Sequence, residues 1–271
     1  MTPRWLIARR GVQLTLLAAF AGAPWWGAPL VQGTLASSRW FGALTLSDPL
    51  VVLQAALAGH AVAAPALLGA AAVAALAAVL AGRLYCGWVC PVNLITDAVE
   101  ALRRAIGWHG ALLPRADRRL RRVVLAGVLL ASALTGSVAW ELLNPISHVV
   151  RALAFGLWGA GAVALAAVAV CDLLLLRRGW CGHLCPVGAF YGLLGRFGRL
   201  HVQARRPEAC THCGDCFQTC PEPQVIAPVL QRQAIGTVIA DVDCLRCGRC
   251  LDRCAENVFA WRLGAPGRSP R

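Results

Sequence analysis

The sequence predicts an α-helical membrane protein whose apolar first two thirds are followed by a small polar α+β domain. Of its 271 residues, 58% are hydrophobic and only 14% are charged, whereas a soluble globular domain has roughly 25% charged residues. The shortage of charge is confined to the chain before about Leu200, and the remainder is polar and rich in cysteine. We therefore expect a membrane domain over residues 1–200 and a second domain over residues 201–271.

Four apolar runs predict four transmembrane helices, because about 20 apolar residues cross a hydrocarbon core. The runs cover residues 11–30, 61–82, 123–143 and 153–176. Every basic residue is an arginine, and the arginines gather before the first run, between the second and third, and after the fourth. The positive-inside rule then predicts a multi-pass protein of the bacterial inner membrane with both termini in the cytoplasm. The net charge of +13 comes with no nucleic-acid recognition motif, so we expect no nucleic-acid partner.

The apolar region contains an internal repeat with an offset of about 95 residues. Asp48-Pro49 and Asn144-Pro145 each precede an apolar helix, and each copy ends in a Cys-x3-Cys-Pro motif. We expect two copies of a two-span unit, related by an axis along the membrane normal. Apolar residues at helical spacing between positions 92 and 106 predict an amphipathic helix that follows the first motif.

Two cysteine runs in the polar domain predict iron–sulfur ligation. Each run has the spacing C-x2-C-x2-C-x3-C, and two such runs in tandem are typical of a two-cluster ferredoxin-like domain. In that pattern the fourth cysteine of each run ligates the other [4Fe–4S] cluster. Zinc is the alternative, but zinc sites usually use two separate cysteine pairs. The predicted ligands are Cys210, Cys213, Cys216 and Cys254 for cluster 1, and Cys244, Cys247, Cys250 and Cys220 for cluster 2.

The two Cys-x3-Cys-Pro motifs hold Cys86 with Cys90 and Cys181 with Cys185. On an α-helix, residues four apart share one face, so each pair could provide two ligands to one metal or a reactive dithiol. The alternative is that these cysteines are small buried residues at a helix end. Two matched copies beside a cysteine-rich domain favour a redox or metal role.

The chain resembles the NapH family of ferredoxin-type membrane subunits. The resemblance covers nearly the whole chain and implies four spans, cytoplasmic termini, quinol oxidation and electron transfer toward a periplasmic nitrate reductase. The chain is then a subunit of a quinol dehydrogenase and not a stand-alone enzyme. The implied partners are the quinone pool, membrane lipid and a periplasmic iron–sulfur protein of the NapG type, with a membrane-anchored c-type cytochrome as a further candidate. The motifs that carry the resemblance are Leu46-Ser47-Asp48-Pro49, Cys86-Gly87-Trp88-Val89-Cys90-Pro91, Trp140-Glu141 with Asn144-Pro145, residues 179–189, and Cys220-Pro221-Glu222-Pro223.

Related ferredoxin-type membrane proteins share this plan and leave a second hypothesis open. They serve methylamine utilisation, nitrous oxide reduction and copper handling, and the second hypothesis is a maturation or assembly factor whose thiols handle a metal. The two complete cysteine runs favour electron transfer, because a metal chaperone needs no paired clusters.

Overall fold

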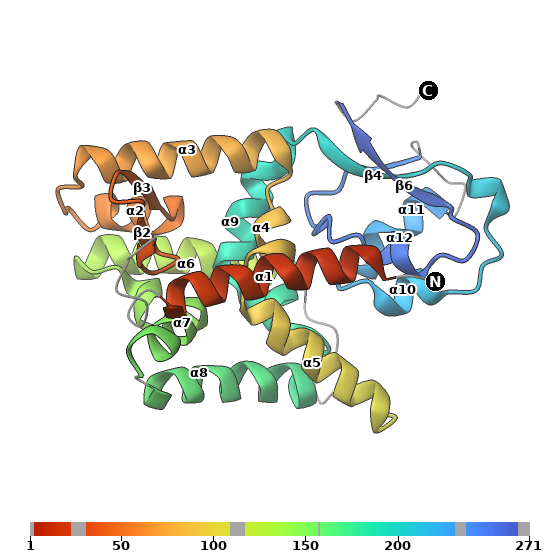
Figure 1. Cartoon of the computed structure of the whole chain (residues 1–271), viewed down its shortest axis with the longest axis horizontal. Helices are drawn as coiled ribbons and strands as arrows, with labels where there is room; N and C mark the ends of the chain where they lie inside the picture. The colour runs from red at the N-terminus through yellow and green to blue at the C-terminus, as the bar shows by residue number, and fades with distance from the viewer. Residues whose placement is uncertain (1–2, 23–30, 109–116, 157, 231–236, 265–271) are drawn as a thin grey trace. The chain divides into compact units, whose positions relative to one another are not determined.

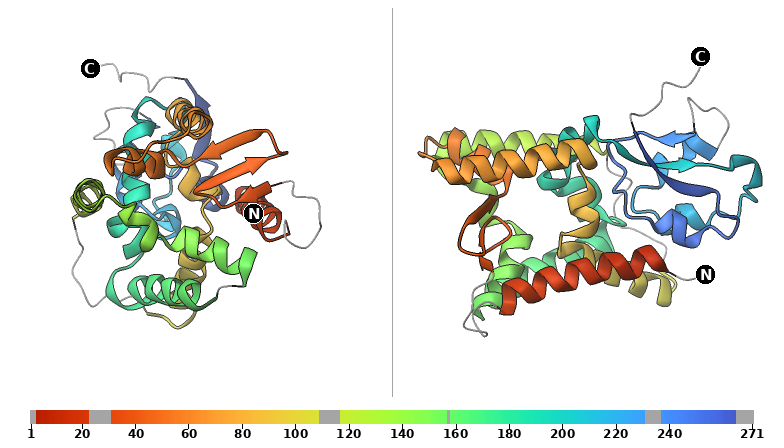
Figure 2. Two further views of the ribbon diagram at one scale, coloured as in Figure 1. Left: turned by 90° about the vertical axis from the view of Figure 1, so that its left-hand side faces the viewer. Right: turned by 45° about the horizontal axis from the view of Figure 1, so that its top comes forward.

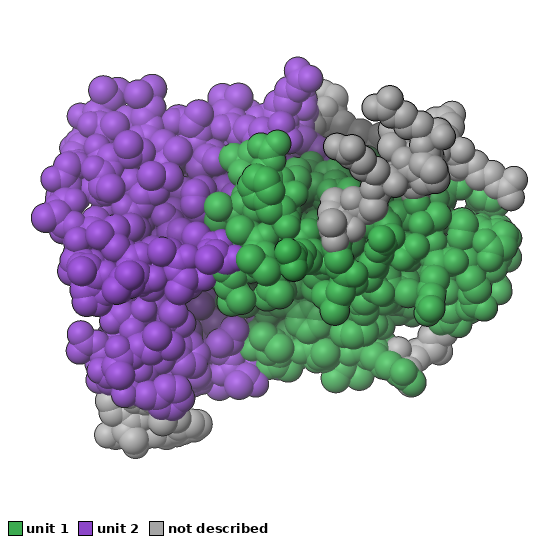
Figure 3. Space-filling model, turned by 90° about the horizontal axis from the view of Figure 1, so that it is seen from above, with its two compact units in different colours: residues 1–13, 76–89, 191–271 green, residues 14–75, 90–190 purple. Residues whose placement is uncertain are grey.

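The computed structural model describes residues 3–22, 31–108, 117–156, 158–230 and 237–264 (Figure 1). The chain divides into two compact units, which are coloured in Figure 3. Unit 1 comprises Met1–Gln13, Leu76–Val89 and Tyr191–Arg271, and unit 2 comprises Leu14–Ala75 and Cys90–Phe190. Unit 1 thus contains the expected second domain together with three earlier segments. The boundary expected at residue 200 stays a prediction.

Unit 1 is built on a small antiparallel sheet with the strand order β5-β4-β6. The central strand β4 (Leu200–Ala204) pairs with β5 (Val238–Ile239) on one side and with β6 (Phe259–Leu263) on the other. Val202 lies opposite Ile239 and opposite Trp261 in the two ladders. The buried side chains Val202, Ile226 and Ile239 form the core of this layer.

Two five-residue helices of unit 1, α10 (Asp215–Thr219) and α12 (Arg249–Arg253), pack against one another. Each begins directly after a glycine with a left-handed backbone, Gly214 (φ 83°) or Gly248 (φ 74°). A side chain rarely adopts this conformation, so glycine is the residue that turns each cysteine run into its helix. Short helices also lie at α4 (Leu84–Trp88) and α11 (Ala227–Leu230), with single turns at η4 (Gly195–Phe197), η5 (Pro207–Ala209) and η6 (Pro223–Val225).

Unit 2 is mainly helical. The helix α7 (Pro145–Phe155) packs on α8 (Trp158–Val170), α5 (Val92–Ala105) packs on α8, and α2 (Pro49–Leu57) packs on α6 (Arg119–Thr135). It also holds the second half of α1 (Arg4–Gly22) and most of α3 (Ala64–Leu80) and α9 (Pro186–Leu194), together with the turns η1 (Ala139–Leu142), η2 (Cys171–Leu175) and η3 (Trp180–Leu184). The sequence analysis did not anticipate its three-stranded antiparallel sheet of β1 (Val31–Gly33), β2 (Ser37–Trp40) and β3 (Leu44–Ser47) (Figure 2).

The internal repeat is visible in how two helices of unit 2 begin. The Asp48 side chain accepts a hydrogen bond from the backbone N–H of Leu50 at 2.9 Å, and the Asn144 side chain accepts one from Ile146 at 3.1 Å. Each cap is followed by proline at the first helical position, where the missing N–H leaves no hydrogen bond unmade. The matched caps give α2 and α7 equivalent starting points in the two copies.

The predicted transmembrane helices are not formed in the described part of the chain, and residues 23–30 of the first predicted run lie outside it. Within the described ranges, no helix combines the length and the apolar character needed to cross a membrane. The apolar runs are cut by glycines: α6 and α7 end at Gly136 (φ 64°) and Gly156 (φ 69°), both left-handed caps of the kind that terminates helices. The 19-residue helix α1 begins at Arg4 and so includes the arginines expected to flank the first run. The fold class of four spans, arranged as two two-span units, is therefore wrong, although the repeat of the sequence is real.

The helix expected after the first cysteine motif forms as α5, and its buried face combines Val92 and Val99 of the apolar stripe with polar side chains. Thr96, Glu100 and Arg103 are all about 2% exposed, whereas Leu102 and Ile106 are 49% and 59% exposed. The Arg103 guanidinium donates to the carbonyls of Asp172 and Leu173, and Glu100 accepts from Arg177, so polar partners hold this face.

Candidate iron–sulfur sites

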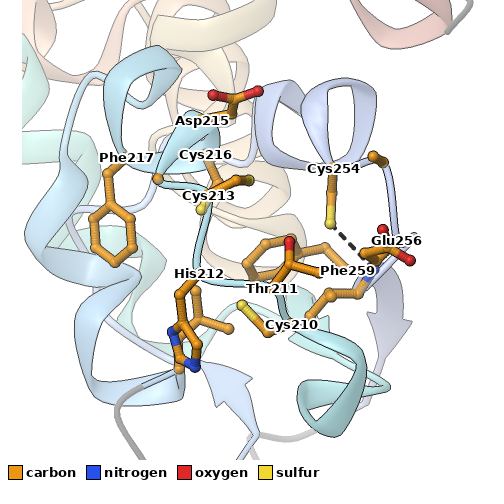
Figure 4. Close-up of a pocket in the computed structure, with 14 residues that line it drawn as sticks. Cys210, Thr211, His212, Cys213, Asp215, Cys216, Phe217, Cys254, Glu256 and Phe259 are labelled. Atoms are coloured by element: carbon orange, nitrogen blue, oxygen red, sulfur yellow. Dashed lines mark hydrogen bonds between the residues drawn. The ribbon is translucent and has the colours of Figure 1, made fainter.

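Four cysteines from both runs surround one cavity of unit 1. Cys210, Cys213, Cys216 and Cys254 line a cavity of about 80 Å³, and their sulfurs face the same space in Figure 4. Cys216 lies in the first turn of α10, and Cys254 follows α12 directly. The packing of α10 on α12 therefore brings the last cysteine of the second run to the first three of the other run. This is the set expected for cluster 1.

The remaining four cysteines surround a second, smaller cavity of about 20 Å³. Cys244, Cys247 and Cys250 come from the second run, and Cys220 closes the first run. This is the set expected for cluster 2. The structure thus gathers both groups of thiols, while ligation by each cysteine stays a prediction.

Burial opposes ionisation of the cysteine thiols that line the two cavities. Burial raises the pKa of Cys216 and of Cys244 to about 11, and it raises the pKa of Cys220 and of Cys250 still further. Without a compensating positive charge, these thiols stay protonated at neutral pH. Bound metal ions deprotonate coordinating thiols outright. Among the described residues, no group of three His, Cys, Asp or Glu side chains is close enough to hold a single metal ion.

Backbone N–H groups point at sulfurs in both sites. The N–H of Val258 donates to the Cys254 sulfur at 3.3 Å, the dashed line of Figure 4. Backbone hydrogen bonds from Phe217 and from Arg246 also lower the pKa of Cys216 and of Cys244, in opposition to burial. Such donors stabilise negative charge on cluster sulfurs and thiolates. The fold therefore supplies both the thiols and the donors that an iron–sulfur cluster requires.

The two sites differ in exposure and in charge. Cys213 is exposed, and the cluster 1 cavity is lined by Asp215 and Glu256. The cluster 2 cavity is lined by Arg249, and its cysteines Cys244 and Cys247 are buried. The cavity of cluster 1 is therefore lined by acidic side chains and reaches an exposed cysteine, whereas the cavity of cluster 2 is lined by an arginine and by buried cysteines.

The first half of the Cys86–Cys90 motif packs on the cluster 2 loop within unit 1. A Cβ atom added to Gly87 would lie 3.1 Å from the Leu245 carbonyl oxygen and 3.4 Å from the Cys247 Cβ. The Trp88 Nε1–H donates to the Arg246 carbonyl at 2.9 Å. A side chain at this position would crowd the Leu245 carbonyl, so the glycine of the motif suits close packing on the cluster 2 loop.

The two cysteine motifs do not form matching α-helical faces. The helix α4 contains Cys86 but ends at Trp88, before Cys90. Cys181 lies in the π-helical turn η3, and Cys185 ends it with an extended backbone. Cys86 belongs to unit 1, whereas the other three belong to unit 2. Their metal or redox role stays a prediction.

Two buried ionic residues beside cluster 2 escaped the sequence analysis. Arg83 entered only as one arginine of a cytoplasmic loop, but it is 1% exposed and pairs with Glu222 at 2.9 Å. It also donates to the Asp243 carbonyl at 2.8 Å. Glu222 lies two residues after Cys220, a predicted ligand of cluster 2. Its position in the sequence could have indicated that it lies near this cluster.

Comparison with known proteins assigns the family. A family model described as a 4Fe-4S dicluster domain matches residues 203–255. The ferredoxin-type protein NapH of Escherichia coli is 44% identical over 97% of this chain and 92% of its own length. The chain belongs to the NapH/MauN family of ferredoxin-type proteins. The methylamine utilization ferredoxin-type protein MauN of Methylorubrum extorquens is 48% identical over 98% of this chain and 92% of its own length.

A second family model supports the internal repeat of this NapH/MauN member. It is described as a 4Fe-4S binding domain and matches residues 62–109 and again 156–205, one segment in each copy. Each segment contains one of the Cys-x3-Cys-Pro motifs. No solved structure matches the chain. The family and both domain matches identify an iron–sulfur electron-transfer protein of the ferredoxin type.

Proposed function

We propose that the protein takes part in quinol oxidation and passes the electrons toward a periplasmic nitrate reductase through partner redox proteins. The observation that carries this proposal is the pair of four-cysteine cavities held together by α10 and α12. [4Fe–4S] clusters, when bound, accept and donate one electron at a time. Two such sites in one small fold suit a protein that splits the two electrons of a quinol into single transfers.

The chain's own residues suggest where electrons enter and leave. Gly87 packs on the cluster 2 loop, so the segment of the first cysteine motif is our candidate for the inner end of the route. Cys213 and His212 are exposed at cluster 1, which makes this edge our candidate for contact with a partner redox protein. The inner-membrane location of the protein and its other partners are part of this proposal.

The MauN relatives favour a second candidate. Their names place them in methylamine utilization, at identities similar to those of the NapH relatives. On this reading the same electron-transfer chemistry supports maturation of the methylamine-oxidising system.

Anaerobic reduction by a quinol tests the proposal. The purified holoprotein is mixed with a water-soluble quinol, and its cluster absorbance is followed. We expect bleaching that approaches the extent produced by dithionite. Clusters that respond to dithionite but to no quinol would contradict the proposal. Restoration of nitrate reduction, or instead of growth on methylamine, in a strain that lacks the gene distinguishes the two candidates.

A further inference from the structure

The two cysteine loops share a left-handed backbone at matched positions but carry different side chains before the second cysteine. The residue before the second cysteine has a left-handed backbone in both loops, at His212 (φ 57°) and at Arg246 (φ 47°). His212 is exposed to solvent, whereas Arg246 is 1% exposed. An arginine in a strained backbone conformation and fully buried is costly, so this position calls for an explanation.

The Arg246 guanidinium is held by carbonyl groups, and no carboxylate of the described residues contacts it. Its Nε donates to the Leu200 carbonyl at 3.0 Å, and its Nη1 donates to those of Ala81 at 3.3 Å and Cys244 at 3.2 Å. In the described part of the chain, its Nη2 has no hydrogen-bond partner. Three carbonyls fix its position but do not neutralise its charge, and a buried, unneutralised charge is strongly unfavourable.

The other charges near cluster 2 largely cancel. Arg83 is paired with Glu222, and Asp243 lies beside this pair. Asp241 faces Arg246 at longer range, and Arg249 lines the cavity. Arg246 thus lies on the cluster 2 loop between two of its cysteines and, among the described residues, has no carboxylate in contact.

A [4Fe–4S] centre with four thiolate ligands is an anion, and each added electron increases its negative charge. We propose that Arg246 is the buried counter-ion of cluster 2 and holds the reduction potential of cluster 2 above that of cluster 1. The cation stabilises the reduced form more than the oxidised form, because the reduced form carries the larger negative charge. At cluster 1, Asp215 and Glu256 line the cavity and act in the opposite direction.

Burial opposes this effect, since an enclosed cluster loses solvation of its reduced form. The same enclosure strengthens the attraction of Arg246, because a Coulomb interaction is about fourfold larger at an effective dielectric constant of 20 than in water. We expect the cation to decide the order of the potentials because its three carbonyl contacts hold it in place. The inference concerns the clusters themselves and holds whichever donor and acceptor the protein serves.

An EPR-monitored redox titration of the anaerobic holoprotein tests the proposal. Arg246→Gln removes the charge, Arg246→Lys keeps it, and His212→Gln is the matched control at the equivalent position of the other loop. We expect Arg246→Gln to lower the higher of the two midpoint potentials. The ratio of reduced to oxidised cluster at fixed potential should fall about tenfold, which is 59 mV for a one-electron couple. Arg246→Lys should restore most of the shift, and His212→Gln should leave that potential unchanged.

Three results would overturn the proposal: unchanged potentials in Arg246→Gln, equal shifts of both clusters, or a shift of the lower potential alone. If Arg246→Gln fails to retain cluster 2, iron analysis of Arg246→Lys decides the matter. A lysine variant that retains both clusters near the original potentials shows that the charge suffices. A lysine variant that also lacks cluster 2 shows that the carbonyl contacts matter and the charge does not.

Discussion

The buried ion pair between Arg83 and Glu222 provides a sharp test of how unit 1 is held together. The two side chains are 1% and 3% exposed, and their charged atoms lie 2.9 Å apart. Arg83 precedes α4, and Glu222 follows the last cysteine of the first run. The pair therefore ties the segment with the first cysteine motif to the loops around cluster 2. We choose Glu222→Ala as the perturbation.

The expected loss is large because Arg83 would stay buried without its carboxylate. Breaking a buried pair by removing one partner costs about 3–5 kcal/mol of unfolding free energy. The hydrogen bond from Arg83 to the Asp243 carbonyl does not neutralise the charge. The exposed pair of Asp117 and Arg119, 3.9 Å apart, is the matched control. Asp117→Asn should cost no more than the ~0–1 kcal/mol typical of exposed pairs.

Urea unfolding under anaerobic conditions measures the difference, with tryptophan fluorescence and cluster absorbance followed together. A double variant, Arg83→Met with Glu222→Leu, removes both charges and should recover much of the loss, because two apolar side chains leave no buried ion unpaired. A cost below 1 kcal/mol for Glu222→Ala, or a double variant no better than the single one, would refute the reasoning.

Three further outcomes are expected. Burial raises the pKa of Asp172 from 3.8 to about 6, so the folded state binds this proton more tightly than the unfolded state. The free energy of unfolding should then fall by about 3 kcal/mol as the pH rises from about 4 to 6, and it should level off above pH 6. Urea unfolding measures this change, because Asp172→Asn lacks the titrating group and the difference between its urea midpoint and that of the wild type should vary over the same pH range. Cys254→Ser should perturb the EPR signal of cluster 1 and Cys220→Ser that of cluster 2; the opposite assignment would contradict the crossed ligation. Gly87→Ala should weaken packing on the cluster 2 loop, where its Cβ would lie 3.1 Å from a carbonyl oxygen, and an unchanged urea midpoint would argue against that contact.

The cysteine sets were predictable because ligand spacing is a local property of the sequence. Gly214 and Gly248 lie inside the runs, and their left-handed backbones set the turns into α10 and α12. The crossed grouping of Cys254 with the first run follows from the known pattern of tandem runs. The helix starts at Asp48 and Asn144 were visible for a similar reason, since a capping side chain acts within two residues.

Helix lengths could not be predicted from apolar runs alone. Composition shows how much apolar sequence is present but not where a left-handed glycine ends a helix, as at Gly136 and Gly156. The buried polar side chains were also hidden, because Arg83 and Arg246 meet partners 139 and 165 residues away. Long-range pairs of this kind leave no periodic signal in the sequence.

Iron and sulfide analysis of the anaerobically purified protein, together with its EPR spectrum after reduction, tests the central claim most directly. Two [4Fe–4S] clusters predict about eight irons and eight acid-labile sulfides per chain, with two reducible centres in the spectrum. A preparation that contains zinc, negligible iron and no reducible centre would contradict the account.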